Sequence, residues 1–196
     1  MAKILFIKPD EAHKRVRLGI ENDDGESAVL KVRESTYTSL GAPGRGCEIA
    51  ESTYRALVRD DELLRAYHKA VTSLADSDKS RYEMRKKLIM LGFSKDIVDV
   101  VLDKCEEYGY LDEARQLMRL VEREANRKLR GRYYIRQKLA AKGYRTADID
   151  RVTNQLVEEG EIDFKKNLKL LLEKKCVSDE GQIKALKYKY GYENKV

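Results

Sequence analysis

The chain repeats one stretch of sequence: SRYEMRKKLIMLGF at residues 80–93 returns as GRYYIRQKLAAKGY at residues 131–144. The two copies align without a gap, 51 positions apart (132 − 81 = 51), and share arginine, tyrosine, leucine and glycine at equivalent places. Self-similarity at a period of roughly 20–50 residues is typical of arrays in which structural repeats stack on their neighbours. The stretch therefore predicts a repeat protein.

Each copy predicts three helices, because apolar residues around it recur at intervals of three and four. In the first copy we expect helices over 62–74, 80–92 and 94–109, the last capped by Ser94. Ser80 followed by Glu83 has the spacing of a capping box, and glycine ends a helix cheaply in the left-handed conformation. The side chains expected to be buried are Leu57, Leu63, Leu64, Tyr67, Val71, Leu74, Met84, Leu88, Leu91, Ile97, Val98, Val101, Leu102 and Cys105.

The same pattern continues to the end of the chain. We divide the array into three-helix repeats over 59–112 and 113–163 and a partial third repeat over 164–196. Thr146 and Ser178 are the expected caps of later helices. The second repeat should bury Leu117, Leu120, Val121, Ile135, Leu139, Ile149, Val152, Leu156 and Val157. The predicted fold class is mainly α, with tandem three-helix repeats in an elongated, curved array.

The segment over 1–58 has a different period. Val16, Leu18 and Ile20 alternate with polar residues or glycine, which is typical of a strand with one buried face. Turn residues follow at 22–25, so we expect a small N-terminal antiparallel sheet of two or three strands. The stretch 32–40 fits either a continued strand or one helical turn. The glycine-rich loop after it lacks the lysine and serine of a phosphate-binding loop.

The charge balance favours an acidic partner. The chain has 40 basic and 34 acidic residues, a net charge of +6 and a pI near 9.0, so nucleic acid is the leading candidate. Cys47, Cys105 and Cys176 have neither metal-ligand nor disulfide spacing, which predicts free thiols in a reducing compartment. No apolar run approaches the roughly 20 residues of a membrane helix, so we expect a soluble, cytoplasmic protein without a membrane partner.

Residues for catalysis do not come together in the sequence. His13 and His68 are isolated from each other and from the cysteines, so no metal site, cofactor or nucleophile is expected. Without a nucleotide-binding loop, any effect on ATP turnover would have to act through the ATPase of a partner. We therefore expect a binding protein and not an enzyme.

The basic residues form the candidate site. Arg81 and Arg85 are four positions apart, as are Arg132 and Arg136, so each pair makes a ridge on one helix. Arginine can contact phosphate through two hydrogen bonds, and tyrosine offers a flat surface. The candidate partner- or DNA-binding residues are Arg81, Tyr82, Arg85, Lys86, Arg127, Arg130, Arg132, Tyr133, Arg136 and Lys138. Two alternatives stay open: the arginines are a solvated face paired with Glu83, Glu122 and Glu124, and the tyrosines fill gaps between helices.

These motifs, taken together, resemble the RecX family, regulators of the RecA recombinase. The resemblance rests on the order and spacing of Ser80, Glu83, Arg85, Leu88 and Gly92 in the first copy and of their counterparts in the second. One departure is Gln116, where the family often has an aromatic residue; Met118 and Leu120 would then supply the packing.

The resemblance implies a non-enzymatic protein that lies along the groove of the RecA–DNA filament and dampens recombinase and ATPase activity in recombinational DNA repair. Its partners would be the RecA filament and single- or double-stranded DNA, and we expect it to act as a monomer. The alternative is a stand-alone helical module that binds nucleic acid without sequence preference and has no protein target.

Overall fold

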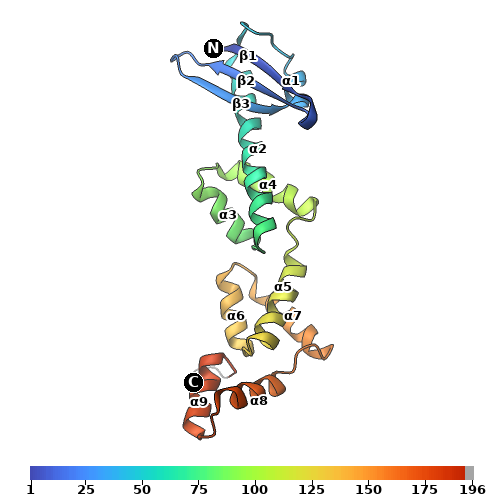
Figure 1. Ribbon diagram of the computed structural model, residues 1–196, viewed down its shortest axis with the longest axis vertical. Helices are drawn as coiled ribbons and strands as arrows, with labels where there is room; N and C mark the ends of the chain where they lie inside the picture. Colours follow the sequence, from blue (N-terminus) through green and yellow to red (C-terminus); the bar gives the residue numbers. More distant parts are fainter. Residues whose placement is uncertain (193–196) are drawn as a thin grey trace. The chain divides into compact units, whose positions relative to one another are not determined.

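The structure is a computed structural model that describes residues 1–192, so the last four residues of the expected third repeat lie outside the described part. The chain falls into two compact units (Figure 1). The first unit contains Met1–Asp76 and Lys87–Tyr108, and the second contains Ser77–Lys86 and Gly109–Val196. The fold is mainly helical with a small N-terminal antiparallel sheet, which confirms the predicted fold class; the division into repeats stays a prediction.

The sheet of the first unit is larger than expected. It is built from β1 (Ala2–Asp10), β2 (Arg15–Glu21), β3 (Ser27–Arg33) and β4 (Glu48–Ile49), and its order over the described residues is β3-β2-β1-β4. Sequence reasoning missed β4, because a strand of two residues carries no period. The ambiguous stretch divides: β3 ends at Arg33 and the short helix α1 (Glu34–Ser39) follows at once.

Carboxylates from a helix cover the outer edge of this sheet. The long helix α2 (Glu51–Asp76) brings buried Asp60 and Asp61 to β3. Asp60 accepts a hydrogen bond from the backbone N–H of Arg33 (2.7 Å), and Asp61 accepts one from that of Lys31 (2.9 Å). An exposed strand edge is a template for pairing with other chains, so these two carboxylates close the β3 edge.

The helix predicted over 62–74 is part of α2, which begins at Glu51. The face of this helix that is buried also differs from the predicted one. Ala66, Ala70 and Ser73 are buried, whereas the larger apolar residues predicted there (Leu63, Leu64, Tyr67, Val71 and Leu74) are only half-buried. Small side chains let the next helix, α4 (Lys95–Glu107), approach closely. The larger residues therefore flank the contact instead of filling it.

The helix α3 (Arg81–Met90) begins at the predicted capping box, which is confirmed. The N–H of Glu83 donates to Ser80 Oγ and the N–H of Ser80 donates to the Glu83 carboxylate, each at 3.1 Å. Met84 and Leu88 are buried as predicted, but Leu91 is 52% exposed because the helix has already ended when the chain reaches it.

The second unit continues with five helices over the described residues: α5 (Glu113–Glu122), α6 (Arg132–Ala141), α7 (Thr146–Glu158), α8 (Phe164–Lys175) and α9 (Glu180–Tyr190). A π-helical segment, Arg123–Arg127, extends α5. The predicted core positions of α5, α6 and α7 are buried, except Val157, which lies on the solvent side.

Three predicted helix caps differ from the structure. Arg145 occupies the cap position before α7 and Asp179 that before α9, one residue from the predicted Thr146 and Ser178. Asp179 accepts a hydrogen bond from the N–H of Gln182. Its negative charge also lies at the positive end of the helix, which stabilises it. Ser94 has the predicted cap position before α4, but its side chain makes no capping hydrogen bond to a backbone N–H of the first turn.

The middle helices of the second unit stack end to start. The Ser80 hydroxyl at the start of α3 donates to the carbonyl of Lys142 at the end of α6. The start of α6 meets the end of α9 in the same way: the N–H of Gly131 donates to the carbonyl of Tyr190 (2.8 Å), and that of Tyr133 to the carbonyl of Gly191 (3.0 Å). The start of one helix therefore meets the end of another at two places, once through a side chain and once through the backbone.

Candidate nucleic-acid interface

A groove of 570 Å³ lies in the second unit where α3 begins, and we call it the arginine groove. Arg81, Tyr82 and Arg85 line it from α3, and Glu113, Ala114 and Leu117 from α5. The remaining lining residues belong to the loop before α7 and to α7 itself: Gly143, Tyr144, Arg145, Asp148, Arg151 and Val152. The groove thus brings the predicted ridge of the first copy against the second.

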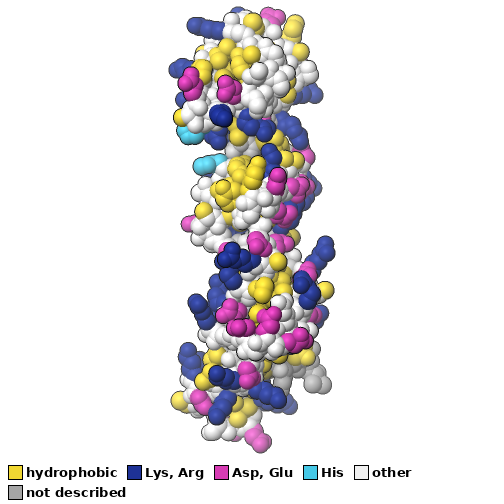
Figure 2. All heavy atoms as spheres, turned by 90° about the vertical axis from the view of Figure 1, so that its right-hand side faces the viewer, with side chains coloured by type: hydrophobic (Ala, Val, Ile, Leu, Met, Phe, Trp, Pro, Cys, Tyr) yellow, Lys and Arg dark blue, Asp and Glu magenta, His cyan; other side chains and the backbone are white. Residues whose placement is uncertain are grey.

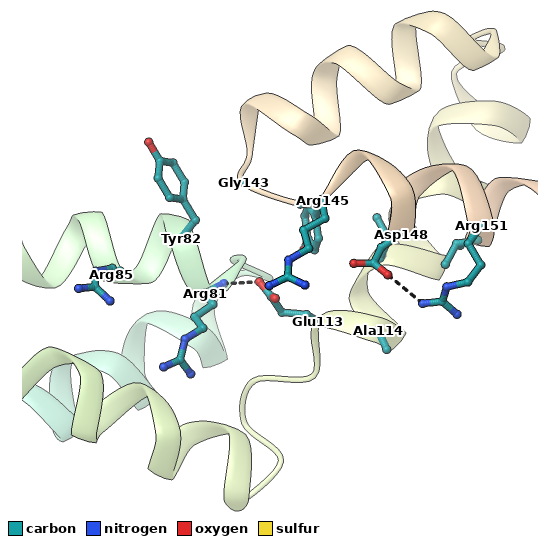
Figure 3. A pocket seen from close by; sticks show the side chains of 12 residues that line it. Arg81, Tyr82, Arg85, Glu113, Ala114, Gly143, Arg145, Asp148 and Arg151 are labelled. Atoms are coloured by element: carbon teal, nitrogen blue, oxygen red, sulfur yellow. Dashed lines mark hydrogen bonds and ion pairs between the residues drawn. The ribbon is translucent and has the colours of Figure 1, made fainter.

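Four arginines line the groove, and Figure 3 shows them from left to right in the order Arg85, Arg81, Arg145 and Arg151. Tyr82 points the other way, and its side chain is exposed. Because Met84 and Leu88 fix which side of α3 is buried, Arg81 and Arg85 are left half-buried at the groove wall. The arrangement gives a short row of planar cations, with the exposed ring of Tyr82 on another side of the same helix.

Two carboxylates also line the groove. Glu113 accepts a hydrogen bond from the backbone N–H of Arg81 at 2.7 Å, at the start of α3 where negative charge is stabilising. Asp148 pairs with Arg151 at 3.2 Å (Figure 3). Four arginines against two carboxylates leave a net charge of +2 (4 − 2) on the lining. The groove therefore favours an anionic ligand.

The floor of the groove is supported by a buried polar contact that sequence reasoning missed. Gln116 is buried, and its Oε1 accepts a hydrogen bond from the hydroxyl of buried Tyr144 (3.3 Å). Burial raises the pKa of the Tyr144 hydroxyl above the ordinary value near 10, at which the group is already a donor at neutral pH. We expected Met118 and Leu120 to supply the packing in place of an aromatic residue at position 116. Leu120 is buried and Met118 is half-buried, and Gln116 is itself buried beside Tyr144.

The basic residues around α6 have defined partners. The Arg132 guanidinium donates to Asn154 and lies 5.7 Å from the ring centre of Phe164. Arg136 is 3.1 Å from the carboxylate of Asp150. None of these partners lines the arginine groove, so the ridge of the second copy does not extend it.

Lys138 is part of an ion cluster around one buried carboxylate. It donates to the carboxylate of Glu124 (2.8 Å), which is only 1% exposed and also accepts from Lys128 (2.9 Å). Burial alone raises the pKa of Glu124, but the hydrogen bonds from Lys138 and Lys128 outweigh it and hold the pKa below its ordinary value. This cluster joins the π-helical segment to α6.

Arg130 lies between two tyrosine rings. Its guanidinium carbon is 4.1 Å from the ring centre of Tyr134 and 4.3 Å from that of Tyr190. These two cation–π contacts link α9, which carries Tyr190, to α6, which carries Tyr134. Arg127 and Tyr133, the last two candidate residues of the second copy, are exposed, as is Lys86 of the first.

Arg145 and Arg151 line the groove but were not predicted. We identified site residues by their recurrence 51 positions apart, and the counterparts of these two in the first copy are Ser94 and Val100. No repeated signal existed, and only the fold brings them to α3. On the face shown in Figure 2, basic and acidic side chains are mixed and do not form one continuous basic stripe.

The described residues contain no group of three or more histidine, cysteine or acidic side chains placed to hold a metal ion. Within the same residues, no helix is both long and apolar enough to span a membrane.

Comparison with known proteins gives a consistent result. The family model for the first three-helix domain of RecX matches residues 66–105. A regulatory protein RecX from Geobacillus sp. (strain WCH70) is 28% identical over 130 residues, covering 66% of this chain and 48% of that protein. The protein of the same name from Clostridioides difficile (strain 630) is 24% identical over 119 residues, covering 61% and 56%. The matches thus span about half the length of these relatives.

Solved structures agree over a larger share of the chain. A crystal structure of regulatory protein RecX superposes with a TM-score of 0.67 at 25% identity and covers 94% of this chain and 89% of its own. RecX from Lactobacillus salivarius superposes with a TM-score of 0.56 at 14% identity, covering 69% and 90%, which concerns the fold alone. Sequence and structure agree on what the chain is similar to: RecX proteins, over most of its described length.

Proposed function

We propose that this chain binds the filament that the RecA recombinase forms on DNA and lowers or modulates its recombinase and ATPase activity. Similarity to RecX proteins supports a regulatory role, because those relatives are named regulatory proteins. The observation that carries the DNA contact is the row of four arginines along the arginine groove.

The chemistry of the groove suits a phosphate backbone. A guanidinium group presents parallel N–H donors that match two phosphate oxygens, and hydrogen bonds between charged groups are the strong ones. Tyr82, 54% exposed beside the row, offers a ring on which a base of single-stranded DNA could stack. Nothing in the groove resembles a helix that reads base edges in a major groove, so we propose contacts without sequence preference.

We assign different roles to the candidate residues. Arg81, Tyr82, Arg85 and Lys86 are proposed to contact DNA or RecA together with Arg145 and Arg151, and exposed Arg127 and Tyr133 remain candidates at a second contact. Arg130, Arg132, Arg136 and Lys138 lie outside the groove and contact residues of neighbouring helices, so we propose that they chiefly hold the helices that carry the surface.

The proposed mechanism needs no catalytic residue in this chain. A monomer that contacts DNA and neighbouring RecA subunits would bind one filament conformation better than another. A ligand shifts a conformational equilibrium by as much as its affinities for the two states differ. Slower ATP hydrolysis would then follow from a change in the partner.

The DNA contact is tested by anisotropy of a fluorescein-labelled oligothymidine. If four phosphates are contacted, log Kd should rise with log salt concentration with a slope of about 2.8, that is about 0.7 per phosphate. The double variant Arg85→Glu/Arg145→Glu should lose at least about 100-fold in affinity, because each charge-assisted contact contributes roughly 1.5–3 kcal/mol.

The matched control is Lys165→Glu/Lys169→Glu, which makes the same net charge change on two exposed residues of α8 outside the groove. It should bind nearly as the parent does. If both double variants lost the same affinity for the oligothymidine, the effect would come from the net charge of the protein and not from the groove. Adding RecA and a non-hydrolysable nucleotide should strengthen binding of the parent; an unchanged affinity would favour the stand-alone nucleic-acid module.

A further inference from the structure

The first unit has a second concave surface, which the proposed DNA contact does not use. Two adjoining hollows of 800 Å³ and 230 Å³ share Arg15, Arg33 and Leu64. The larger lies along the start of β2 and α1, and the smaller continues between α2 and α4. We call them together the sheet-edge groove.

The smaller hollow has an apolar floor. Leu63, Leu64 and Tyr67 of α2 are half-buried there, Val101 of α4 is buried, and Tyr108 is 62% exposed. These are the large side chains that flank the close contact between α2 and α4. Clusters of apolar side chains left open to solvent in a concave site commonly mark binding sites.

The rim of the groove is basic. His13, Lys14, Arg15 and Lys104 contribute to the lining, whereas Glu34 is the one acidic lining residue among those described. Arg33 is held by Asp60, so its charge is partly balanced. A basic rim around an apolar floor is complementary to an acidic ligand with an apolar part.

The volume of the smaller hollow, the orientation of its rings and the closed strand edge limit which class of ligand the groove can bind. The hollow of 230 Å³ is below the roughly 300–1,000 Å³ typical of small-molecule sites, but it can hold a single side chain. The rings of Tyr67 and Tyr108 meet edge to face, at 6.5 Å and 78°, so they do not form two parallel platforms for successive bases. Addition of a strand to β3 is excluded at Lys31 and Arg33, because Asp61 and Asp60 already accept their N–H groups.

We propose that the sheet-edge groove is a docking site for an acidic peptide segment of a partner protein, anchored by one aromatic or branched apolar side chain. The anchor would fill the hollow over Leu64, Tyr67 and Tyr108. The acidic residues on either side would face Arg15, Lys14 and Lys104. One buried anchor surrounded by complementary charges is the usual source of affinity in such interfaces.

The test uses two fluorescein-labelled ten-residue peptides with a central phenylalanine, one flanked by aspartate and glutamate and the other by lysine. The parent should bind the acidic peptide and bind the basic one at least tenfold more weakly. Tyr108→Ala should weaken binding of the acidic peptide at least tenfold, and so should Arg15→Glu/Lys104→Glu. Circular dichroism checks that each variant is folded, which the exposure of Tyr108 and Arg15 favours.

The matched control is Arg17→Glu/Lys69→Glu, an equal charge change on exposed residues of β2 and α2 that do not line the groove. It should keep the affinity of the parent. The proposal is overturned if the parent does not bind the acidic peptide, if the control loses as much as the groove variants, or if the groove variants lose binding of an oligothymidine instead. Neither RecA nor DNA is present in the peptide assay, so its outcome is independent of the proposed function.

Discussion

Gly143 is the residue on which the joint between α3 and α6 depends most closely. Its backbone has φ = +90°, and a Cβ placed on it would lie 2.3 Å from Cβ and 2.5 Å from Cγ of Tyr82. Gly92 ends α3 with φ = +89°, but a Cβ there would have no atom within 4 Å. The two glycines share the backbone strain of the left-handed conformation and differ only in the close approach.

This pair allows the cost of the contact to be separated from the cost of the backbone. Gly92→Ala should destabilise by about 1–2 kcal/mol, the strain of one alanine in the left-handed region. Gly143→Ala should cost that amount and roughly 1–3 kcal/mol more, because Tyr82 must shift to make room. The expected totals are therefore about 1–2 kcal/mol for Gly92→Ala and about 2–5 kcal/mol for Gly143→Ala.

Urea denaturation, monitored separately for the two units by amide exchange, measures both values. Tyr82→Gly removes the three atoms that clash (Cβ, Cγ and Cδ1), so the double variant Gly143→Ala/Tyr82→Gly should recover the additional cost in a double-mutant cycle. Equal destabilisation by Gly92→Ala and Gly143→Ala would refute the close packing of α3 on α6.

Three other contacts give predictions of the same kind. Glu124→Gln should destabilise the second unit by about 1–3 kcal/mol at pH 7, because Lys128 and Lys138 lose their charged acceptor. The cost should not exceed this range, because both lysines are partly exposed and water can solvate them instead. The pKa of Glu124 is lower in the folded than in the unfolded chain. The stability difference between the parent and Glu124→Gln should therefore be complete above pH 4.5 and should vanish as the pH falls through the lowered pKa. Urea titrations at several pH values would measure it. Asp60→Ala should accelerate amide exchange at Arg33, and Asp61→Ala at Lys31, by roughly 10-fold or more, since each amide loses a charge-assisted acceptor; unchanged rates would contradict the edge closure. Arg130→Ala should lower the amide protection of α9 and leave α7 unchanged, and Arg130→Lys should not restore it, because only a flat guanidinium fits between Tyr134 and Tyr190.

The helices and their local ends could be predicted from the sequence because their causes are local. The capping box of Ser80 and Glu83 depends on residues three apart, and Gly92, Gly109, Gly143 and Gly160 all take the left-handed conformation that ends a helix. The alternation of β2 likewise predicts its buried face. These signals depend only on residues close in sequence, so they do not require knowledge of the tertiary contacts.

The parts that could not be predicted depend on contacts between distant residues. The buried face of α2 is decided by α4, which needs small residues opposite it, so Ala66 and Ala70 are buried more deeply than Leu63 or Leu64. Glu124 looked like a solvated partner for arginine but is buried, because Lys138, fourteen positions away, neutralises it. Arg145 and Arg151 join the groove only through the packing of α7 beside α3, which no repeat in the sequence encodes.

The central claim is that this chain regulates RecA through the arginine groove. The most direct measurement is the rate of ATP hydrolysis by RecA on single-stranded DNA as the parent, Arg85→Glu/Arg145→Glu or Lys165→Glu/Lys169→Glu is added. We predict that the parent and the α8 variant inhibit at similar concentrations, and that the groove variant needs at least about 100-fold more, consistent with the loss of two charge-assisted contacts. Equal inhibition by all three proteins would contradict the assignment of the groove, and an ATPase rate unaffected by the parent would contradict the proposed function itself.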